Sequence, residues 1–392
     1  MSNRSILQNV RILDFSWVLA GPYATRLLAD FGAEVIKVQP PLPEAEDQFS
    51  RGYYNTWNRN KLGVSLDLGQ PAGIEIAGKL AKISDILVEN FSPRVMSNWK
   101  LDYPGVKKLK PDIIYLSMSV MGHSGPWRDY SGFGPTVQAF SGITSLTAYP
   151  DRPPSGLGSS YSDHVAGLYA SLALLGALEH RRQTGEGQYI DLSQTETMTS
   201  LLSDAVVDFT LTGRAPSPQG NLSCRAAPHG IYPCRGADRW CAIAVTTDRE
   251  WESFACALGS PEWAHEERFA TLAGRLQNRQ PLDDLIQKWT LAHTAEEAMA
   301  ILQTAGIPAG VVQNAADLAL DPQLQARGFF IELQHPLMGK ILADGSPLKF
   351  SESQAEYRLA APTRGRDNDY VFRRLLGLSE DEIKILKQNK VI

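Results

Sequence analysis

Short apolar runs recur through the first half of the chain, separated by stretches with helical spacing. Strands that are apolar on both faces are typical of parallel sheets, whose two faces are covered by helices. The Gly21-Pro22 turn predicts a helix that ends at Gly32, and Pro71 predicts the start of another. This alternation predicts a doubly wound α/β domain with a parallel sheet. The predicted strands are VRILDF, EVIKV, VSLDL, DILVEN, IIYLSMSV and QYIDLS.

The pattern changes at TGRAPSPQGNLS, a stretch rich in glycine, proline and serine. Such a composition is typical of a connection between domains, and we place a linker at 211–224. The next stretch, HGIYPCRGADRWCAIAV, predicts two strands joined by a turn, and helical patterns follow it. We therefore expect a smaller α+β domain over 225–325. From about Phe329 the chain is predicted to be irregular until a last helix in SEDEIKILKQNK.

The most apolar helical stretch, 165–178, follows a loop rich in glycine and serine. It is shorter than the roughly 20 residues that a membrane-spanning helix needs, so we expect a buried helix. Asp163 lies at its predicted start. Aspartate and serine are common N-cap residues, and either Ser162 or Asp163 suits that role. The positive end of a helix also keeps a carboxylate ionised, so a nucleophilic role for Asp163 is compatible with capping.

Composition narrows the classes of function. A net charge of −5 and a pI near 5.9 argue against nucleic acid or an anionic membrane as the main partner. Four cysteines without a Cys-x-x-Cys pair fit a reducing compartment better than a disulfide or zinc framework. The N-terminal segment has no uninterrupted apolar region and no small-residue cleavage site, so we expect a cytoplasmic protein.

Familiar cofactor and hydrolase motifs are missing from the sequence. The first predicted strand-to-helix turn, SWVLAGPYA, lacks G-x-G-x-x-G, and the second strand ends in Gln39 rather than in an acid that would bind ribose. The sequence contains no G-x-x-x-x-G-K-[ST], G-x-S-x-G or H-E-x-x-H, and its histidines do not fall at metal-ligand spacing. We expect neither a metal nor a permanently bound cofactor.

Over nearly its whole length the sequence resembles the class III CoA-transferases, the family of formyl-CoA and carnitine CoA-transferases. The resemblance implies an enzyme that moves CoA from an acyl-CoA donor to a carboxylic acid acceptor. It also implies that Asp163 carries the acyl group, first as a mixed anhydride and then as an aspartyl-CoA thioester. The matching stretches are VRILDFSWVLAGPYATRLLADFGAEVIKV, NRNKLGVSLDL, DILVENFSP, YSDHVAGLYASLALLGALEHRRQTGEGQYIDLS, HGIYPC and IPAGVVQNAADLALDPQLQARGFF.

The same resemblance implies a fold and a set of CoA contacts. It implies a large Rossmann-like, CoA-binding domain built from 1–210 and 330–392, with the small domain between them. Two chains are expected to interlock as a homodimer, and a homologous second subunit remains an alternative. By the resemblance, CoA is a substrate whose contacts are Arg59, Asn60, Lys61, Asn90, Phe91 and Arg94.

Departures from particular members bear on the reaction. Members that act on formate and oxalate carry glutamine at the position of Leu19, so formyl-CoA transfer is not expected. The racemases of the family use a histidine as their base where this chain has Phe133, which counts against racemase chemistry. An acyl-CoA racemase or an intramolecular CoA isomerase is kept as the alternative function. Whether His164 or His123 touches substrate stays open, as do the donor and the acceptor. Candidate pocket walls are Trp17, Leu19, Tyr23, Tyr53, Tyr54, Phe133, Phe140 and Tyr161.

Overall fold

The computed structural model describes residues 5–41 and 52–392, and the chain divides into two compact units. Residues 145–155, which the sequence analysis assigned to the large domain, group with the second unit. The first unit draws on Met1–Thr144, Gly156–Pro216 and Pro322–Ile392, and the second on Ser145–Ser155 and Ser217–Asp321.

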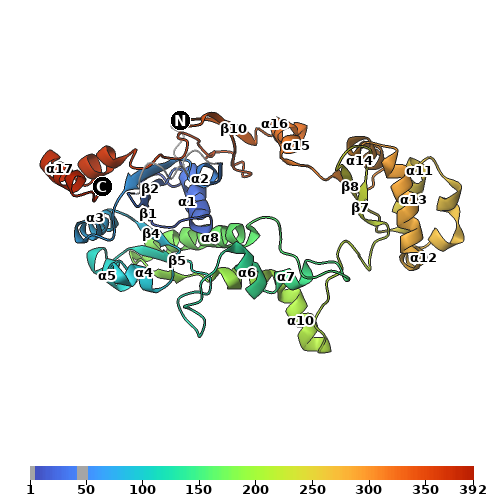
Figure 1. The fold of residues 1–392 in the computed structure, drawn as a ribbon, viewed down its shortest axis with the longest axis horizontal. Coiled ribbons are helices and arrows are strands. Elements are labelled where there is room, and N and C mark those ends of the chain that lie inside the picture. The colour runs from blue at the N-terminus through green and yellow to red at the C-terminus, as the bar shows by residue number, and fades with distance from the viewer. Residues whose placement is uncertain (1–4, 42–51) are drawn as a thin grey trace. The chain divides into compact units, whose positions relative to one another are not determined.

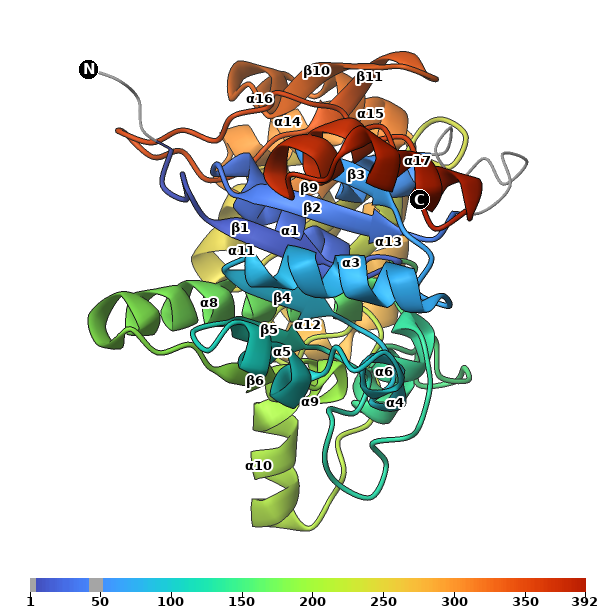
Figure 2. The same cartoon turned by 90° about the vertical axis from the view of Figure 1, so that its left-hand side faces the viewer.

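The first unit is built on a six-stranded parallel sheet with the strand order β3-β2-β1-β4-β5-β6 (Figure 2). The prediction of an α/β fold with a parallel sheet is confirmed. The order reverses between β1 and β4, and in open α/β sheets ligands bind outside the carboxyl ends of the strands at such a switch point. The strands are β1 Arg11–Asp14, β2 Glu34–Gln39, β3 Lys61–Ser65, β4 Ile86–Glu89, β5 Ile114–Ser117 and β6 Tyr189–Asp191.

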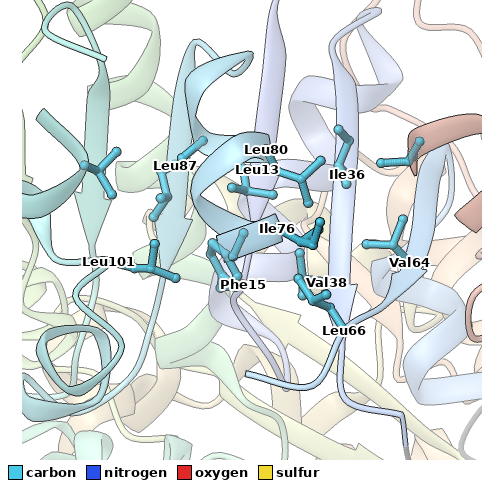
Figure 3. Packing of buried hydrophobic residues seen from close by; sticks show 14 of the residues in the cluster. Leu13, Phe15, Ile36, Val38, Val64, Leu66, Ile76, Leu80, Leu87 and Leu101 are labelled. Carbon is cyan, nitrogen blue, oxygen red and sulfur yellow. The ribbon is translucent and has the colours of Figure 1, made fainter. Parts of the chain in front are cut away.

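Successive residues of each strand point to opposite faces of this sheet, and each face is covered by helices. On one face, α3 (Pro71–Lys82) packs on a cluster that includes Leu13, Ile36 and Leu87. Figure 3 shows Ile76 of α3 among these side chains. This cluster also receives α5 (Tyr103–Leu109), the π-helix η5 (Asp369–Leu375) and α17 (Glu380–Gln388), where the last predicted helix is confirmed.

The opposite face of the sheet is covered by α1 (Ala20–Asp30) and α8 (Tyr161–Thr184), which lie side by side in Figure 1. Ile12 of the sheet, Ala24 of α1 and Ala170 of α8 are fully buried in this cluster. Its small side chains let the two helices come close to each other and to the strands. Within 5–41 and 52–392, no helix combines the length with the apolarity that crossing a membrane requires.

Shorter helices and a hairpin complete the first unit. The hairpin pairs β10 (Phe330–His335) with β11 (Gly339–Asp344), so the prediction of an irregular chain after about Phe329 is wrong for this segment. Apolar and polar residues alternate only weakly along its two strands, and most of these residues are half-buried or exposed. The sequence therefore carries only a weak strand signal here. The helices are α2 Gly52–Trp57, α4 Arg94–Asn98, α6 Gly134–Phe140, α9 Gln194–Thr199, the 3-10 helix η2 Ser200–Leu202, α10 Ser203–Thr212 and α16 Pro322–Ala326.

The second unit contains a three-stranded antiparallel sheet, β7 (His229–Pro233), β8 (Trp240–Ala244) and β9 (Ala309–Val311). The first two strands lie where the sequence predicts them. The third, in IPAGVV, was not predicted because Pro308 and Gly310 interrupt its apolar run. α7 (Ile143–Leu146) spans the division between the units, and the other helices here are α11 Asp248–Ala257, α12 Leu272–Gln277, α13 Arg279–Leu291, α14 Ala295–Thr304 and α15 Ala315–Leu320, with the 3-10 turns η3 Glu262–His265 and η4 Glu267–Phe269.

Helices α1 and α8 pack closely against each other at Gly167. A Cβ atom at this position would lie 2.8 Å from Cδ1 of Tyr23 and 2.9 Å from the carbonyl oxygen of Ala20. Carbon atoms at that separation overlap, so the approach of the two helices depends on the missing side chain. The start of α1 is thereby held against the first turns of α8.

We predict that Gly167→Ala lowers the free energy of unfolding by about 1–3 kcal/mol, because the added methyl group forces α1 and α8 apart. Gly176 in the same helix is the matched control, since a Cβ there meets nothing within 4 Å. Gly176→Ala should raise stability by about 0.5–1 kcal/mol through helix propensity alone. Urea denaturation of both variants measures the difference, and equal effects would contradict the close contact.

Candidate active site

Asp163 lies in the first turn of α8 and is 8% exposed. The helix begins at Tyr161, two residues earlier than predicted, so the N-cap position belongs to Ser160. The prediction of Ser162 or Asp163 as the N-cap residue is therefore wrong. Asp163 is instead the third residue of the helix, where the unpaired backbone N–H groups favour a negative charge.

The Asp163 carboxylate is buried but surrounded by donors. Burial raises its pKa, while hydrogen bonds from Ser162 and from the backbone N–H groups of Asp163 and Ala20, together with the charge of His164, act in the opposite direction. The Ser162 hydroxyl lies 3.4 Å from Oδ2 of Asp163. Since Ala20 is the first residue of α1, the N-terminal ends of two helices meet at this carboxylate.

The start of α6 forms another side of the site. A Cβ atom at Gly134 would lie 2.7 Å from Oδ2 of Asp163, and the Ser162 hydroxyl oxygen lies 3.2 Å from the Gly134 carbonyl oxygen. The backbone of α6 therefore approaches the carboxylate in a way that only glycine permits. Phe133, the N-cap residue of α6, precedes it and is 66% exposed.

The two histidines considered from sequence lie in different surroundings. His164 packs its ring against Tyr23 and Trp57, each at a centroid distance of 5.1 Å, and its Nδ1 is 2.8 Å from the carbonyl oxygen of Ser160. His123 lies beyond the carboxyl end of β5, with Nε2 3.6 Å from Glu89. Burial raises the pKa of Glu89 to about 7 and lowers that of His123.

A pocket of about 850 Å³ opens at the carboxyl ends of the central strands. Its residues follow β1, β2, β3 and β4, on both sides of the switch point between β1 and β4. Tyr53 lines the pocket, and burial together with the charge of Asp163 raises its pKa. The lining residues are Phe15, Ser16, Trp17, Val18, Pro22, Lys37, Val38, Gln39, Pro40, Tyr53, Tyr54, Asn58, Leu66, Asp67, Leu68, Gly69, Phe91 and Trp99.

The predicted CoA contacts divide into two groups, of which the first is buried. Arg59 is 1% exposed and forms an ion pair with Asp30, with Nη2 and Oδ2 2.6 Å apart. The Asn60 side chain donates to the same Asp30 at 2.8 Å. Lys61 is fully buried and pairs with Asp14 at 3.1 Å. In this chain both cations are enclosed by their ion pairs.

The second group of predicted contacts lies around the pocket. Phe91 lines it and packs edge-on against Trp99 at a centroid distance of 5.7 Å. Asn90, just before it, donates to and accepts from the backbone of Trp17. Arg94 is exposed and pairs with Asp129 at 3.3 Å. Among the aromatic wall residues expected from sequence, Trp17, Tyr53 and Tyr54 line the pocket.

Sequence reasoning missed the buried charges at the end of β1. Asp14 accepts from Lys37 at 3.2 Å and from Lys61 at 3.1 Å. Burial by itself would raise the pKa of Asp14, but the two lysines, with hydrogen bonds from Ser16 and Thr25, hold it well below its usual range. The signal available in the sequence was a charged residue, Asp14, Lys37 or Lys61, within each of three apolar strands.

These features describe an α/β protein that holds a buried carboxylate near a pocket at the switch point of its sheet. The family model of CoA-transferase family III matches residues 7–368. The chain therefore belongs to CoA-transferase family III and is an enzyme of that class.

Relatives within this family match nearly the whole length of the chain. It is 35% identical to the succinyl-CoA–D-citramalate CoA-transferase of Chloroflexus aurantiacus, over 98% of each chain. It is 30% identical to the succinate–glutarate CoA-transferase of Agrobacterium fabrum, over 94% of this chain and 95% of the relative. The crystal structure of a CAIB/BAIF family protein from Brucella suis is similar with a TM-score of 0.88 and 30% identity, covering 95% of this chain and all of that one.

We predict that Lys61→Met lowers the free energy of unfolding by about 3–5 kcal/mol, because it removes one partner of a buried carboxylate. Lys79→Met is the control, since Lys79 forms only an exposed pair with Glu75 along α3, a type of pair that contributes less than about 1 kcal/mol. Thermal and urea unfolding measure both variants. A stable Lys61→Met protein with a raised KM for acyl-CoA would instead identify Lys61 as a CoA contact.

Proposed function

We propose that this enzyme transfers CoA between carboxylic acids and that Asp163 is its nucleophile. The observation that carries the proposal is the buried Asp163 carboxylate in the first turn of α8, with the backbone of Gly134 close beside it. Membership of CoA-transferase family III supports the reaction class. Burial also favours the mechanism, because water would hydrolyse an activated acyl group.

The proposed reaction proceeds through two covalent forms of Asp163. Its carboxylate attacks the donor thioester carbonyl, the carbon–sulfur bond breaks, and CoA leaves as the thiolate while a mixed anhydride forms. The thiolate then attacks the Asp163 carbonyl carbon, which releases the donor acid and leaves an aspartyl-CoA thioester. The acceptor carboxylate repeats these steps in reverse, so acyl-CoA of the acceptor leaves and the Asp163 carboxylate is restored.

The residues around Asp163 have defined tasks in this scheme. The N–H groups of Ala20 and Asp163 stabilise the ionised carboxylate before attack, opposing the effect of burial on its pKa. The same donors are suited to an oxyanion that forms on the Asp163 carbonyl in the later steps. Gly134 has no side chain, so the space beside Oδ2 of Asp163 is left to the acyl group.

We propose that CoA enters the pocket at the carboxyl ends of β1 to β4. Phe91 and Trp99 line this pocket and offer aromatic faces for the adenine ring, and Tyr53 lines it as well. Its size, about 850 Å³, is within the range of cofactor sites. On this proposal Arg59 and Lys61 hold the fold around the pocket, and exposed Arg94 is the cation available to a CoA phosphate.

The relatives suggest the class of substrates. Two of them are named for succinyl-CoA or succinate together with a second dicarboxylic acid, D-citramalate or glutarate. We propose succinyl-CoA as the donor and a dicarboxylic acid as the acceptor. The racemase alternative receives less support, because Phe133 stands beside Gly134 and Asp163 where a base would be needed.

A homodimer is part of the proposal. Helix α8 leaves Leu168, Leu172 and Leu175 exposed, and Leu172 is 69% exposed. Helix α10 has no buried residue, and Leu211 on it is 78% exposed. Helices that expose this much apolar surface are typical of an interface, and a second copy of the chain is the partner that we propose.

We predict that Asp163→Ala lowers kcat for CoA transfer from succinyl-CoA at least about 1,000-fold, because the proposed reaction then lacks its acyl carrier. Asp381→Ala, in the exposed first turn of α17, should retain native activity. Wild-type enzyme incubated with succinyl-CoA and hydroxylamine should show a hydroxamate at residue 163 by peptide mass spectrometry. Retained transfer by Asp163→Ala, at an unchanged melting temperature, would exclude the proposed nucleophile.

We predict that the native chain has the mass of a dimer by light scattering and that the double variant Leu172→Glu, Leu211→Glu does not. The substitutions place charges in the proposed apolar interface, where desolvation is costly. Ile385→Glu, on exposed α17, serves as the control for an added surface charge. A native monomer, or a double variant that stays dimeric, would contradict this interface.

A further inference from the structure

The loop between β1 and α1 has a strained backbone. Val18 adopts a φ of 64°, in the left-handed region that β-branched residues almost never occupy. Such a conformation persists only when surrounding contacts impose it, and it is concentrated at functional sites. Val18 lies two residues before Ala20, the first residue of α1, and the carbonyl oxygen of Ala20 is one of the atoms that a Cβ at Gly167 of α8 would meet. The geometry of this loop therefore sets where α1 begins against the helix that carries Asp163.

The contact that holds the loop comes from the neighbouring strand. The Trp17 N–H donates to Oδ1 of Asn90 at 2.9 Å, and Nδ2 of Asn90 donates to the Trp17 carbonyl oxygen at 2.9 Å. One amide side chain thus pairs with both backbone polar groups of the residue before Val18. Asn90 follows β4, so this pairing crosses the switch point between β1 and β4.

The residues on either side of Asn90 hold it in place. The next residue, Phe91, donates its N–H to Oε2 of Glu89 at 2.8 Å, and Glu89 is fully buried at the end of β4. The ring of Phe91 lies 6.1 Å from that of Trp17, so the two loops also touch through their side chains. The amide of Asn90 is therefore presented to the Trp17 backbone by a rigid support.

We propose that Asn90 is a positioning residue, which holds the strained Trp17–Ala20 loop so that the start of α1 keeps its place against α8, the helix that carries Asp163. The inference rests on the proposed function of Asp163 and assigns Asn90 a task other than binding CoA. Both polar ends of its amide are engaged by Trp17. Asn90 acts through the loop on the chemical step, whereas a CoA contact would act mainly on binding.

A double-mutant cycle with Val18 tests this assignment. Asn90→Ala should lower kcat about 10–100-fold, because the start of α1 beside the helix of Asp163 then shifts, and change the KM for succinyl-CoA less than about 3-fold. Glycine at position 18 tolerates the left-handed conformation, so the loop then needs less support. In the Val18→Gly background, Asn90→Ala should therefore cost at least about 3-fold less in kcat than in the native background.

Other variants and outcomes sharpen the kinetic test. Asn90→Asp keeps the acceptor for the Trp17 N–H but loses the donor to its carbonyl oxygen, so its kcat should lie at or below that of Asn90→Ala. Asn389→Ala, at the exposed end of α17, is the matched control. An Asn90→Ala effect that falls on KM, or one that is equal in both backgrounds at position 18, overturns the proposal.

Hydrogen exchange tests the clamp independently of catalysis. In Asn90→Ala the amide of Trp17 should exchange at least about 10-fold faster than in native protein, while amides in the strands stay protected. Native exchange at Trp17 in this variant overturns the proposal. Should Asp163→Ala retain transfer, the proposed function fails, and the exchange result still decides whether Asn90 holds the loop.

Discussion

The buried charges at the end of β1 are the interaction on which the rest of the site depends. Asp14 accepts from Lys37 of β2 and Lys61 of β3, and Lys61 also donates to the Pro22 carbonyl oxygen in α1 at 2.9 Å. Three neighbouring strands and one helix are therefore joined through a single carboxylate in a water-poor interior, where an unpaired charge is very costly. The Thr25 hydroxyl adds a second link from α1 at 2.7 Å.

This arrangement explains why the candidate nucleophile lies near the switch point of the sheet. With β1 and the start of α1 held by Asp14, the intervening loop has a defined path, and it passes the Asn90 turn after β4. Gly167 lets α8 approach that same start, which brings the first turn of α8, with Asp163, close to the start of α1. The carboxyl ends of the central strands, two helix starts and a strained loop thus lie around one carboxylate, and burial alone would tend to protonate it.

Residues that look alike in the sequence take different roles in the structure. Arg59 and Lys61 stand in a polar run, yet Arg59 joins α1 to the segment around Asp344 and Lys61 completes the pairing of Asp14. Asn90 and Phe91 are adjacent, yet one pairs with a backbone and the other lines a pocket. Such partners lie tens to hundreds of residues away, so local spacing carries no information about them. The β10–β11 hairpin was missed for a related reason, since its pairing compensates for a weak alternation.

The sequence by itself determined the α/β class, the parallel strands and their helices, because burial on both faces imposes continuous apolar runs and helical spacing. Together with the resemblance, it also predicted membership of the CoA-transferase family, which the comparisons confirmed. Only the tertiary structure decided where α8 begins, which charges are buried as pairs, and which donors reach Asp163. Those features depend on the packing of segments that are distant in the chain, and packing is settled only when the strands and helices come together.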